Sequence, residues 1–169
     1  MQSPEPLFRV RRAQVADIPA LRSVRLEALS DTPDAFGSTY EREIARTQED
    51  WLRWLSPGAA FLLDTDTGAA GMVACAHDRN NVSDDASIVW LMAMWVRGSW
   101  RATGAAAALV DAVKVWAGEE CASEVRLKVI DTNLRACQFY ERVGFQLTGR
   151  QNPRERDGMT ELEMAFRVK

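Results

Sequence analysis

Two short segments of the sequence place small residues and reactive polar groups at spacings that suit a site for an anionic cofactor. The first begins at Trp95 and reads WVRGSWRATGAA, so that an apolar stretch leads into a glycine- and alanine-rich turn. The second begins at Asn133 and reads NLRACQFYERVGF, in which the amide of Asn133 and the phenol of Tyr140 stand out. A phenol can donate a proton, and an amide can both donate and accept hydrogen bonds.

The first segment predicts a cradle for a diphosphate. A helix opens at Gly104 with only glycine and alanine in its first turn, directly after a buried strand and a tight loop. The free N–H groups and the dipole of a helix start attract an anion, and small side chains let a phosphate approach the backbone. Arg97 and Arg101 add positive charge nearby. An alanine-rich helix start packed against a neighbouring element explains the same residues equally well.

Two common nucleotide sites do not fit this segment. The loop has no Gly-Lys-Ser or Gly-Lys-Thr, which a phosphate-binding P-loop requires. A dinucleotide fold needs an acidic residue at a strand tip about 20 residues further on, and Glu119 and Glu120 fall at a helix end instead.

Composition narrows the choice of function further. The 169 residues carry a formal net charge of −3, which favours neither nucleic acid nor an anionic membrane as a partner. One histidine, His77, and the separated cysteines Cys75, Cys121 and Cys137 show no metal-ligand spacing and no disulfide framework. We therefore expect buried, reduced thiols in a cytoplasmic protein without a metal, a signal peptide or a membrane span.

Hydrophobic periodicity gives the elements that must position the two segments. Strands are predicted at Leu7–Arg12, Ala59–Asp64, Ala69–Ala76, Ser87–Val96, Glu124–Ile130, Phe145–Gly149 and Met159–Val168, and helices over Asp17–Ala28, Glu41–Leu55, Gly104–Ala117 and Ala136–Val143. The strand Ser87–Val96 is strongly apolar, which predicts burial on both faces. Strands and helices in this order predict an α/β domain with a mixed sheet.

Taken together, the two segments resemble the acetyl-CoA-binding core of the GNAT superfamily of N-acetyltransferases. The residues that carry the resemblance are Arg101, Gly104 and Ala106 in the loop, and Asn133, Ala136, Phe139, Tyr140, Gly144 and Phe145 after the next strand. The resemblance covers Ser87–Gly149 firmly, and it extends more weakly to the Asp17–Ala28 helix and the Pro33–Ser38 loop. It implies one domain over residues 1–169, with a mostly antiparallel sheet of about seven strands and four flanking helices.

The resemblance also implies a mechanism and a set of site residues. In this superfamily an amine attacks the thioester of acetyl-CoA directly, and a backbone N–H of the fourth strand stabilises the developing oxyanion. Tyr140 is expected to protonate the leaving thiolate. The residues expected to bind the cofactor are Met94, Trp95, Val96, Arg101, Ala102, Thr103, Gly104, Ala105, Ala106, Asn133 and Arg135. Other roles stay open: Tyr140 also suits the apolar core, Asn133 a helix N-cap and Arg135 an exposed helix face.

This sequence departs from the superfamily pattern at two positions. Gly98 stands where a proline is frequent, and Ala102 replaces the first glycine of the loop. Alanine suits such a loop only where its φ is negative.

The acceptor side is less defined. We expect a small-molecule or peptide amine, bound between the loop Asp31–Thr39, the tryptophans of the second helix and the loop Arg150–Gly158. Asp31 and Asp34 are candidates for attracting a cationic amine. Candidates for the general base are Glu41, Glu43, His77, Asp84 and Asp85, and none is favoured. The resemblance allows a homodimer, and a domain that binds acyl-CoA without acetylating anything is the alternative reading.

Overall fold

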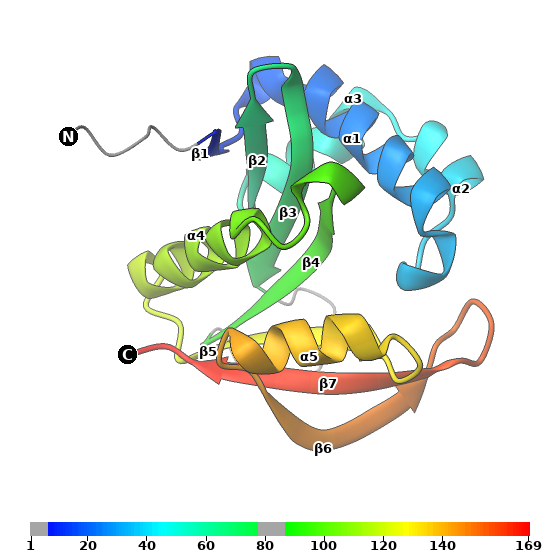
Figure 1. The fold of residues 1–169 in the computed structure, drawn as a ribbon, viewed down its shortest axis with the longest axis vertical. Helices are drawn as coiled ribbons and strands as arrows, with labels where there is room; N and C mark the ends of the chain where they lie inside the picture. The colour runs from blue at the N-terminus through cyan, green and yellow to red at the C-terminus, as the bar shows by residue number, and fades with distance from the viewer. Residues whose placement is uncertain (1–6, 78–86) are drawn as a thin grey trace.

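The computed structural model describes residues 7–77 and 87–169, which form one seven-stranded sheet in the order β1-β2-β3-β4-β5-β7-β6 (Figure 1). Among the described strands, β4 and β5 are parallel and the other neighbours are antiparallel. The strands are β1 (Phe8–Arg12), β2 (Ala59–Thr65), β3 (Gly68–His77), β4 (Ile88–Val96), β5 (Glu124–Ile130), β6 (Gln146–Pro153) and β7 (Thr160–Arg167). The predicted mixed, mostly antiparallel sheet is confirmed.

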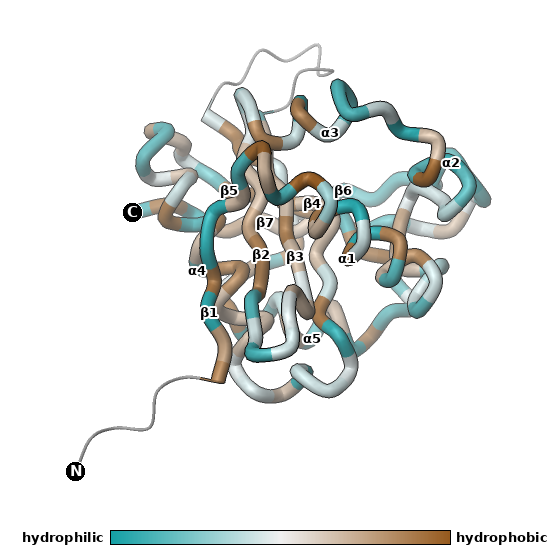
Figure 2. The backbone as a smooth tube through the Cα atoms, turned by 90° about the horizontal axis from the view of Figure 1, so that it is seen from above, coloured by the Kyte–Doolittle hydropathy of each residue, from teal (hydrophilic) through white to brown (hydrophobic). Residues whose placement is uncertain are grey.

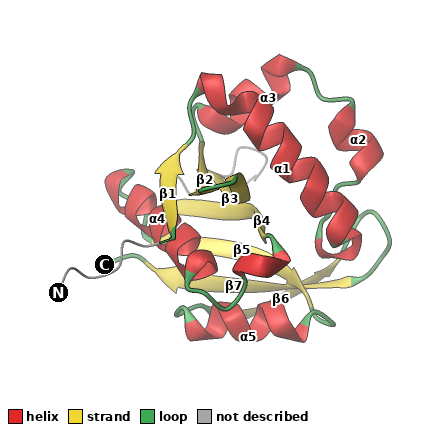
Figure 3. Cartoon of the chain, turned by 45° about the horizontal axis from the view of Figure 1, so that its top comes forward, coloured by secondary structure: helices red, strands yellow, loops and turns green. Residues whose placement is uncertain are grey.

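Helices cover both faces of the sheet (Figure 3). They are α1 (Ile18–Asp31), α2 (Tyr40–Ile44), α3 (Gln48–Leu55), α4 (Ala105–Glu119) and α5 (Leu134–Arg142). On one face, α4 buries Leu109, Val113 and Trp116 against the strands, and α5 adds Tyr140 to the same cluster. On the other face, α1 and α3 contact the sheet and α2 packs on α1.

The apolar residues that hold these layers together run through the middle of the sheet, as the brown segments of β2 and β3 show (Figure 2). Leu62 and Met72 point into the cluster under α1, whereas Leu63 and Val73 belong to the cluster under α4. Adjacent residues of a strand point to opposite faces, so these strands are buried on both sides and are apolar throughout.

The single helix predicted over Glu41–Leu55 is in fact two helices, which brings the number of described α-helices to five. Thr47 breaks it, because its side chain accepts a hydrogen bond from the Asp50 amide while the Asp50 carboxylate accepts one from the Thr47 amide. This reciprocal capping box starts a new helix. At the other end of the chain, β6 continues past the predicted Gly149 to Pro153, where it still pairs with β7.

The ladder between β4 and β5 is short, and this separates the two strands. Ile88, Val89 and Trp90 pair with β5, and the strands diverge beyond Trp90. On the other side of β4 the register with β3 shifts, so that Ala93 and Met94 stand opposite the single residue Val73, and Ala93 has a φ of +54°. This is a β-bulge, which re-aims side chains and bends the strand. The prediction that this strand is buried on both faces was therefore wrong: Met92 is 38% exposed.

Candidate functional site

A cavity of about 680 Å³, called here the first cavity, lies where β4 leaves β5, between the start of α4 and the length of α5. Of the residues expected to bind the cofactor or to act as the acid, all but Thr103 and Ala105 line it. Ala105 is fully buried beneath the helix start, and the Thr103 hydroxyl donates to the Trp100 carbonyl, 2.6 Å away. The structure thus gathers two distant segments of the sequence around one space.

The loop before α4 exposes backbone to this cavity. Gly104, the N-cap residue, has a φ of +89°, and a Cβ added there would meet no atom within 4 Å. Ala106 and Ala107 follow in the first turn and also line the cavity. First-turn N–H groups have no partner within their own helix, so this end can receive an anion.

The condition given for an alanine at position 102 is not met, because the φ of Ala102 is +59°. An L-residue in this left-handed region costs about 1–2 kcal/mol. The loop has kept the backbone conformation that suits glycine and carries the strain of an alanine in it.

The two arginines expected to supply charge are occupied elsewhere. Arg97 forms a bidentate ion pair with Glu27, with nitrogen–oxygen distances of 2.7 and 2.8 Å. Arg101 lines the cavity, but its guanidinium donates to the Val96 carbonyl and to Asp31. These contacts join the end of β4 to the end of α1.

Two other arginines on α5 face the first cavity. Arg135 was expected there, whereas Arg142 was missed. Within residues 7–77 and 87–169, neither side chain has an acidic group within 4 Å. Arg142 is the last residue of α5, where an arginine is ordinary surface charge in a sequence. Only its place in the cavity lining distinguishes it.

Asn133 begins the segment of α5 that lines the cavity, and Tyr140 lies further along the same segment. Tyr140 is 8% exposed, packs against the Phe139 and Phe145 rings, and burial raises the pKa of its hydroxyl above the ordinary value. It therefore stays protonated and can act as a donor. Asn133 is the N-cap of α5, with its Oδ1 accepting from the Ala136 amide at 3.2 Å. Its side-chain NH₂ can still donate to a ligand.

A second cavity of about 1040 Å³ lies on the α1–α3 face, and it shares Ala35 and Phe36 with the first. It is walled by the segments expected to bind the acceptor, since the 33–38 loop, Trp54 of α3 and Arg150 of β6 all contribute. Trp51 does not, because it is 1% exposed in the core. Consecutive β4 residues open on the two spaces, Ala93 on the second and Met94 on the first.

The acidic residues considered in the sequence mostly have other partners. Asp31 accepts from the Trp95 indole and from Arg101, which together hold the pKa of its carboxyl below the usual value. The Asp34 side chain is 89% exposed and contributes to neither cavity. Glu43 is fully buried between Arg25 and Arg46. Asp84 and Asp85, and the loop predicted over Asp78–Asp85, lie outside the described residues.

Two carboxylates that were missed, Glu161 and Glu163, line the second cavity. They alternate with the apolar Leu162 and Met164 in β7, and the register pairs Glu163 with Lys128 and Glu161 with Ile130. The alternation was a usable signal for one polar face of the last strand. The partner strand could be assigned only from the sheet order.

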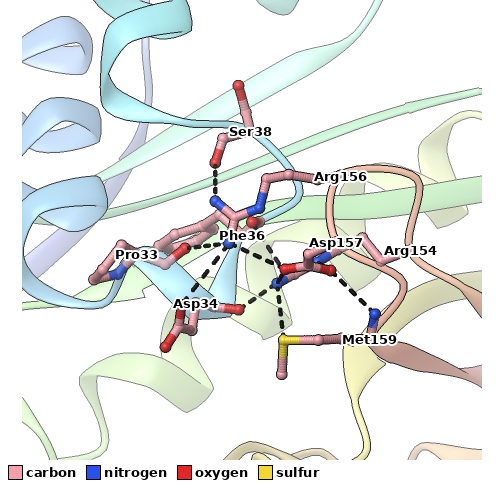
Figure 4. Close-up of polar contacts among 8 residues, drawn as sticks. All are labelled: Pro33, Asp34, Phe36, Ser38, Arg154, Arg156, Asp157 and Met159. Atoms are coloured by element: carbon pink, nitrogen blue, oxygen red, sulfur yellow. Dashed lines mark hydrogen bonds and ion pairs between the residues drawn. The ribbon is translucent and has the colours of Figure 1, made fainter.

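The loop shared by the two cavities is clasped by the β6–β7 hairpin (Figure 4). Arg154, 4% exposed, donates to the carbonyls of Asp34 and Phe36 at 2.9 and 3.1 Å and pairs with Asp157. The Arg154 guanidinium holds the pKa of Asp157 well below its usual range. Arg156 adds longer contacts to the Pro33 and Ser38 carbonyls. A segment 120 residues away in the sequence thus fixes the wall between the cavities.

The thiols were only partly as expected. Cys75 is buried and burial raises its pKa to about 12, whereas Cys121 is exposed at the end of α4, with a φ of +57°. Within the part of the chain that the structure describes, no group of three or more His, Cys, Asp or Glu side chains is placed to hold a metal. No helix there is long and apolar enough to cross a membrane.

Comparison with known proteins gives a consistent result. The model of the acetyltransferase (GNAT) family matches residues 23–145. No curated protein matches the sequence.

Solved structures match across nearly the whole chain. An acetyltransferase of the GNAT family from Streptococcus pneumoniae superposes with a TM-score of 0.78 at 18% identity, over 96% of this chain and 99% of that one. A protein from Salmonella typhimurium, solved with its cofactor acetyl-CoA, gives 0.77 at 15% identity over 96% and 94%. A ribosomal-protein-alanine N-acetyltransferase from Brucella melitensis gives 0.77 at 17% identity over 95% and 99%. At these identities the similarity shows the fold.

Proposed function

The chain belongs to the acetyltransferase (GNAT) family, and from this premise we propose that it transfers an acetyl group from acetyl-CoA to a primary amine, with Tyr140 as the general acid. The observation that carries the proposal is the meeting of two cavities at the β4 bulge. One is lined by the start of α4 and by Tyr140, and the other reaches the same point from the opposite face of the sheet.

The chemistry of the residues present suits acetyl-CoA. The first cavity offers main-chain amides at Ala106 and Ala107 and two cationic side chains, Arg135 and Arg142, for the diphosphate. The gap between β4 and β5 leaves strand backbone unpaired along its length, and an amide-rich pantetheine arm can pair with it. The Asn133 side chain lies beside this gap.

The chain's own groups then have distinct tasks. Bound acetyl-CoA supplies the thioester, and the amine attacks its carbonyl carbon from the second cavity. Backbone N–H groups of β4 around Met94, at the bulge, are suited to stabilise the oxygen as it gains charge. Tyr140 holds its proton at the phenol oxygen and gives it to the departing thiolate. Phe36, between the two cavities, limits the access of water.

A domain that only binds acyl-CoA is the second candidate, and one observation favours it. Among the described residues, those that line the first cavity include no Asp, Glu or His to act as a general base. In an active enzyme the amine must therefore lose its proton on the acceptor side. Release of CoA thiol in the presence of an amine panel separates the two, because a pure binder releases thiol no faster than buffer.

Gly104→Glu tests the location of the cofactor. It puts an anion at the helix start, so acetyl-CoA should no longer protect the protein against thermal unfolding. A ligand at about 1,000 times its Kd contributes roughly 4 kcal/mol, so the loss is easily measured. Gly104→Asn is the matched control, since asparagine tolerates a positive φ and carries no charge. A folded Gly104→Glu protein that still binds acetyl-CoA normally would overturn this location.

Tyr140→Phe tests the acid. Turnover should fall by about 10²-fold or more while the Kd for acetyl-CoA changes little, because the hydroxyl acts only in the reaction. Since burial raises the pKa of Tyr140, the wild-type rate should keep rising past pH 9 as the amine deprotonates, without a fall near pH 10 where an ordinary phenol ionises. Equal losses of turnover and affinity would identify a packing residue instead.

A further inference from the structure

The second cavity is rich in cations although the chain as a whole is slightly acidic. Its charged lining residues are Arg25, Arg53, Arg126, Lys128 and Arg150 on the positive side and Glu161 and Glu163 on the negative side. Surrounding acids account for part of this excess. Arg25 pairs with Glu43, Arg126 with Glu124 and Glu163, and Arg53 with Glu49 and Asp50.

Lys128 and Arg150 are different. Among the described residues, neither side chain has an acidic group within 4 Å. The register places both of them beside Glu163, since Lys128 pairs with it directly and Arg150 lies in the shifted part of β6 opposite it. The Glu163 carboxylate nevertheless turns to the Thr148 hydroxyl, 3.1 Å away, and toward Arg126. Within the described residues the two cations thus form no ion pair, in a cavity that also contains tryptophan and methionine side chains.

A polar donor beside Lys128 also lacks a partner. The Lys128 ammonium lies 5.6 Å from the centre of the Trp90 ring, and both residues line the cavity. The Trp90 Nε1 is buried and, within the described residues, has no hydrogen-bond partner. A buried donor without an acceptor is costly, so an acceptor that arrived with a ligand would be favourable at this indole. An anionic oxygen is the acceptor that suits both an indole N–H and two cations.

Glu161 is an acidic side chain that lines the same cavity two residues before Glu163 on β7. It pairs with Ile130, the last residue of β5, which lies beyond the point where β4 leaves the sheet. Counted on from Trp90 and Arg126, Ile130 comes near the level of Met94 and the bulge. Lys128 is two residues back along β5, about 7 Å away. Glu161 thus lies near the level of the β4 bulge, and the cations Lys128 and Arg150 lie further from it. This arrangement suits a molecule that carries both a positive and a negative group.

From this arrangement we propose that the acceptor is a small amine that also carries an anionic group, as an amino acid or an aminoalkyl phosphonate does. Its anion would lie on Lys128 and Arg150 with the Trp90 indole, and its amine would lie toward Glu161 and the gap between β4 and β5. The inference rests on the proposed function, because it names the substrate of that same site. Asp31 and Asp34, the acids expected to attract the amine, take no part.

The test compares matched acceptors in a thiol-release assay with saturating acetyl-CoA. The panel contains α- and ω-amino acids, their carboxamides, aminoalkyl phosphonates, simple alkylamines and diamines. Anionic acceptors should show kcat/KM values roughly tenfold or more above those of the carboxamides. This preference would oppose intrinsic reactivity, because a carboxamide lowers the pKa of the nearby amine and leaves more of it unprotonated. Comparing the kcat/KM values of carboxylate and phosphonate acceptors then shows which of the two anionic groups the site prefers.

Substitutions in the second cavity test which residues cause the preference for anionic acceptors. Lys128→Gln and Arg150→Gln should each lower kcat/KM roughly tenfold for anionic acceptors and by less than about twofold for carboxamides. Lys128→Glu should shift the preference toward diamines. Arg9→Gln is the control for net charge, since Arg9 is exposed on β1 and lines neither cavity. Thermal unfolding with acetyl-CoA confirms that each variant is folded.

The outcomes separate this inference from the proposed function. If neutral amines or diamines are acetylated at least as well as the anionic ones, the acceptor class is wrong and the acetyltransferase activity stands. An equal loss for all acceptors in Lys128→Gln and Arg150→Gln would also overturn it, since those residues would then be structural. If no amine in the panel releases thiol while acetyl-CoA still stabilises the protein, it is the proposed activity that fails.

Discussion

The cavities on the two faces of the sheet differ in the groups that surround them. On the α4 and α5 face the buried cluster is apolar, and the groups offered to a ligand are mainly the backbone of β4 and of the α4 start. On the α1–α3 face, charged side chains are buried: Arg25, Glu43 and Arg154 are each 5% exposed or less. A site made of main-chain groups depends on backbone shape, whereas a site walled by ion pairs depends on every partner being present.

Removing Glu43 should give the largest effect and should confine it to the α1–α3 face. Glu43 separates Arg25 from Arg46, and both arginines also stack on Trp54. Burial lowers the pKa of Arg25, a penalty that Glu43 offsets. Glu43→Ala should therefore lower the free energy of unfolding by about 3–5 kcal/mol, measured by urea denaturation.

The control is Glu41→Gln, an exposed position on the same short helix, which should change stability by less than about 0.5 kcal/mol. At a temperature where Glu43→Ala is folded, its Kd for acetyl-CoA should match that of the wild type. A loss of affinity for acetyl-CoA as large as the loss of kcat/KM for the acceptor would show that the two faces are not independent.

Arg154→Met should give an intermediate effect, because it frees the loop that both cavities share. The substitution leaves the Asp34 and Phe36 carbonyls without their donor and Asp157 without its partner. We expect a loss of about 2–3 kcal/mol in the free energy of unfolding and a higher KM for the acceptor.

Arg156→Met is the matched control, since its contacts in the same clasp are 3.3 Å or longer. It should cost less than about 1 kcal/mol. Comparable losses for the two variants would mean that the clasp acts through its net charge and not through the buried hydrogen bonds of Arg154.

Ala102→Gly should give the smallest effect, and one of opposite sign. It removes the strain of a left-handed alanine at the α4 start, so the free energy of unfolding should rise by about 0.5–1 kcal/mol after the greater entropy of an unfolded glycine is counted. The Kd for acetyl-CoA should not weaken. Ala105→Gly, at a fully buried helical residue, should instead destabilise by about 1 kcal/mol or more. A destabilised Ala102→Gly would refute the strain at this position.

Most of the secondary structure, the family and most residues of the first cavity could be predicted from the sequence. These depend on local patterns: alternation in strands, helical stripes, and the small residues that must lie where backbone is offered to a ligand. Asn133 and Tyr140 are seven residues apart, at the N-cap and within α5, so a local motif that resembles the family was enough to assign both to one site.

Which charged side chains form ion pairs could not be predicted from the sequence, because the pairs join elements far apart along the chain. Arg97 and Arg101 looked available in the sequence and are taken by Glu27 and Asp31 from α1, some 70 residues away. β5 and β6 lie on either side of β7, which brings Lys128 and Arg150 beside Glu163. Within the described residues neither of them forms an ion pair with it. Ion pairing depends on distance in space, and hydrophobic periodicity records which face a residue points to but not which strand or helix it will meet.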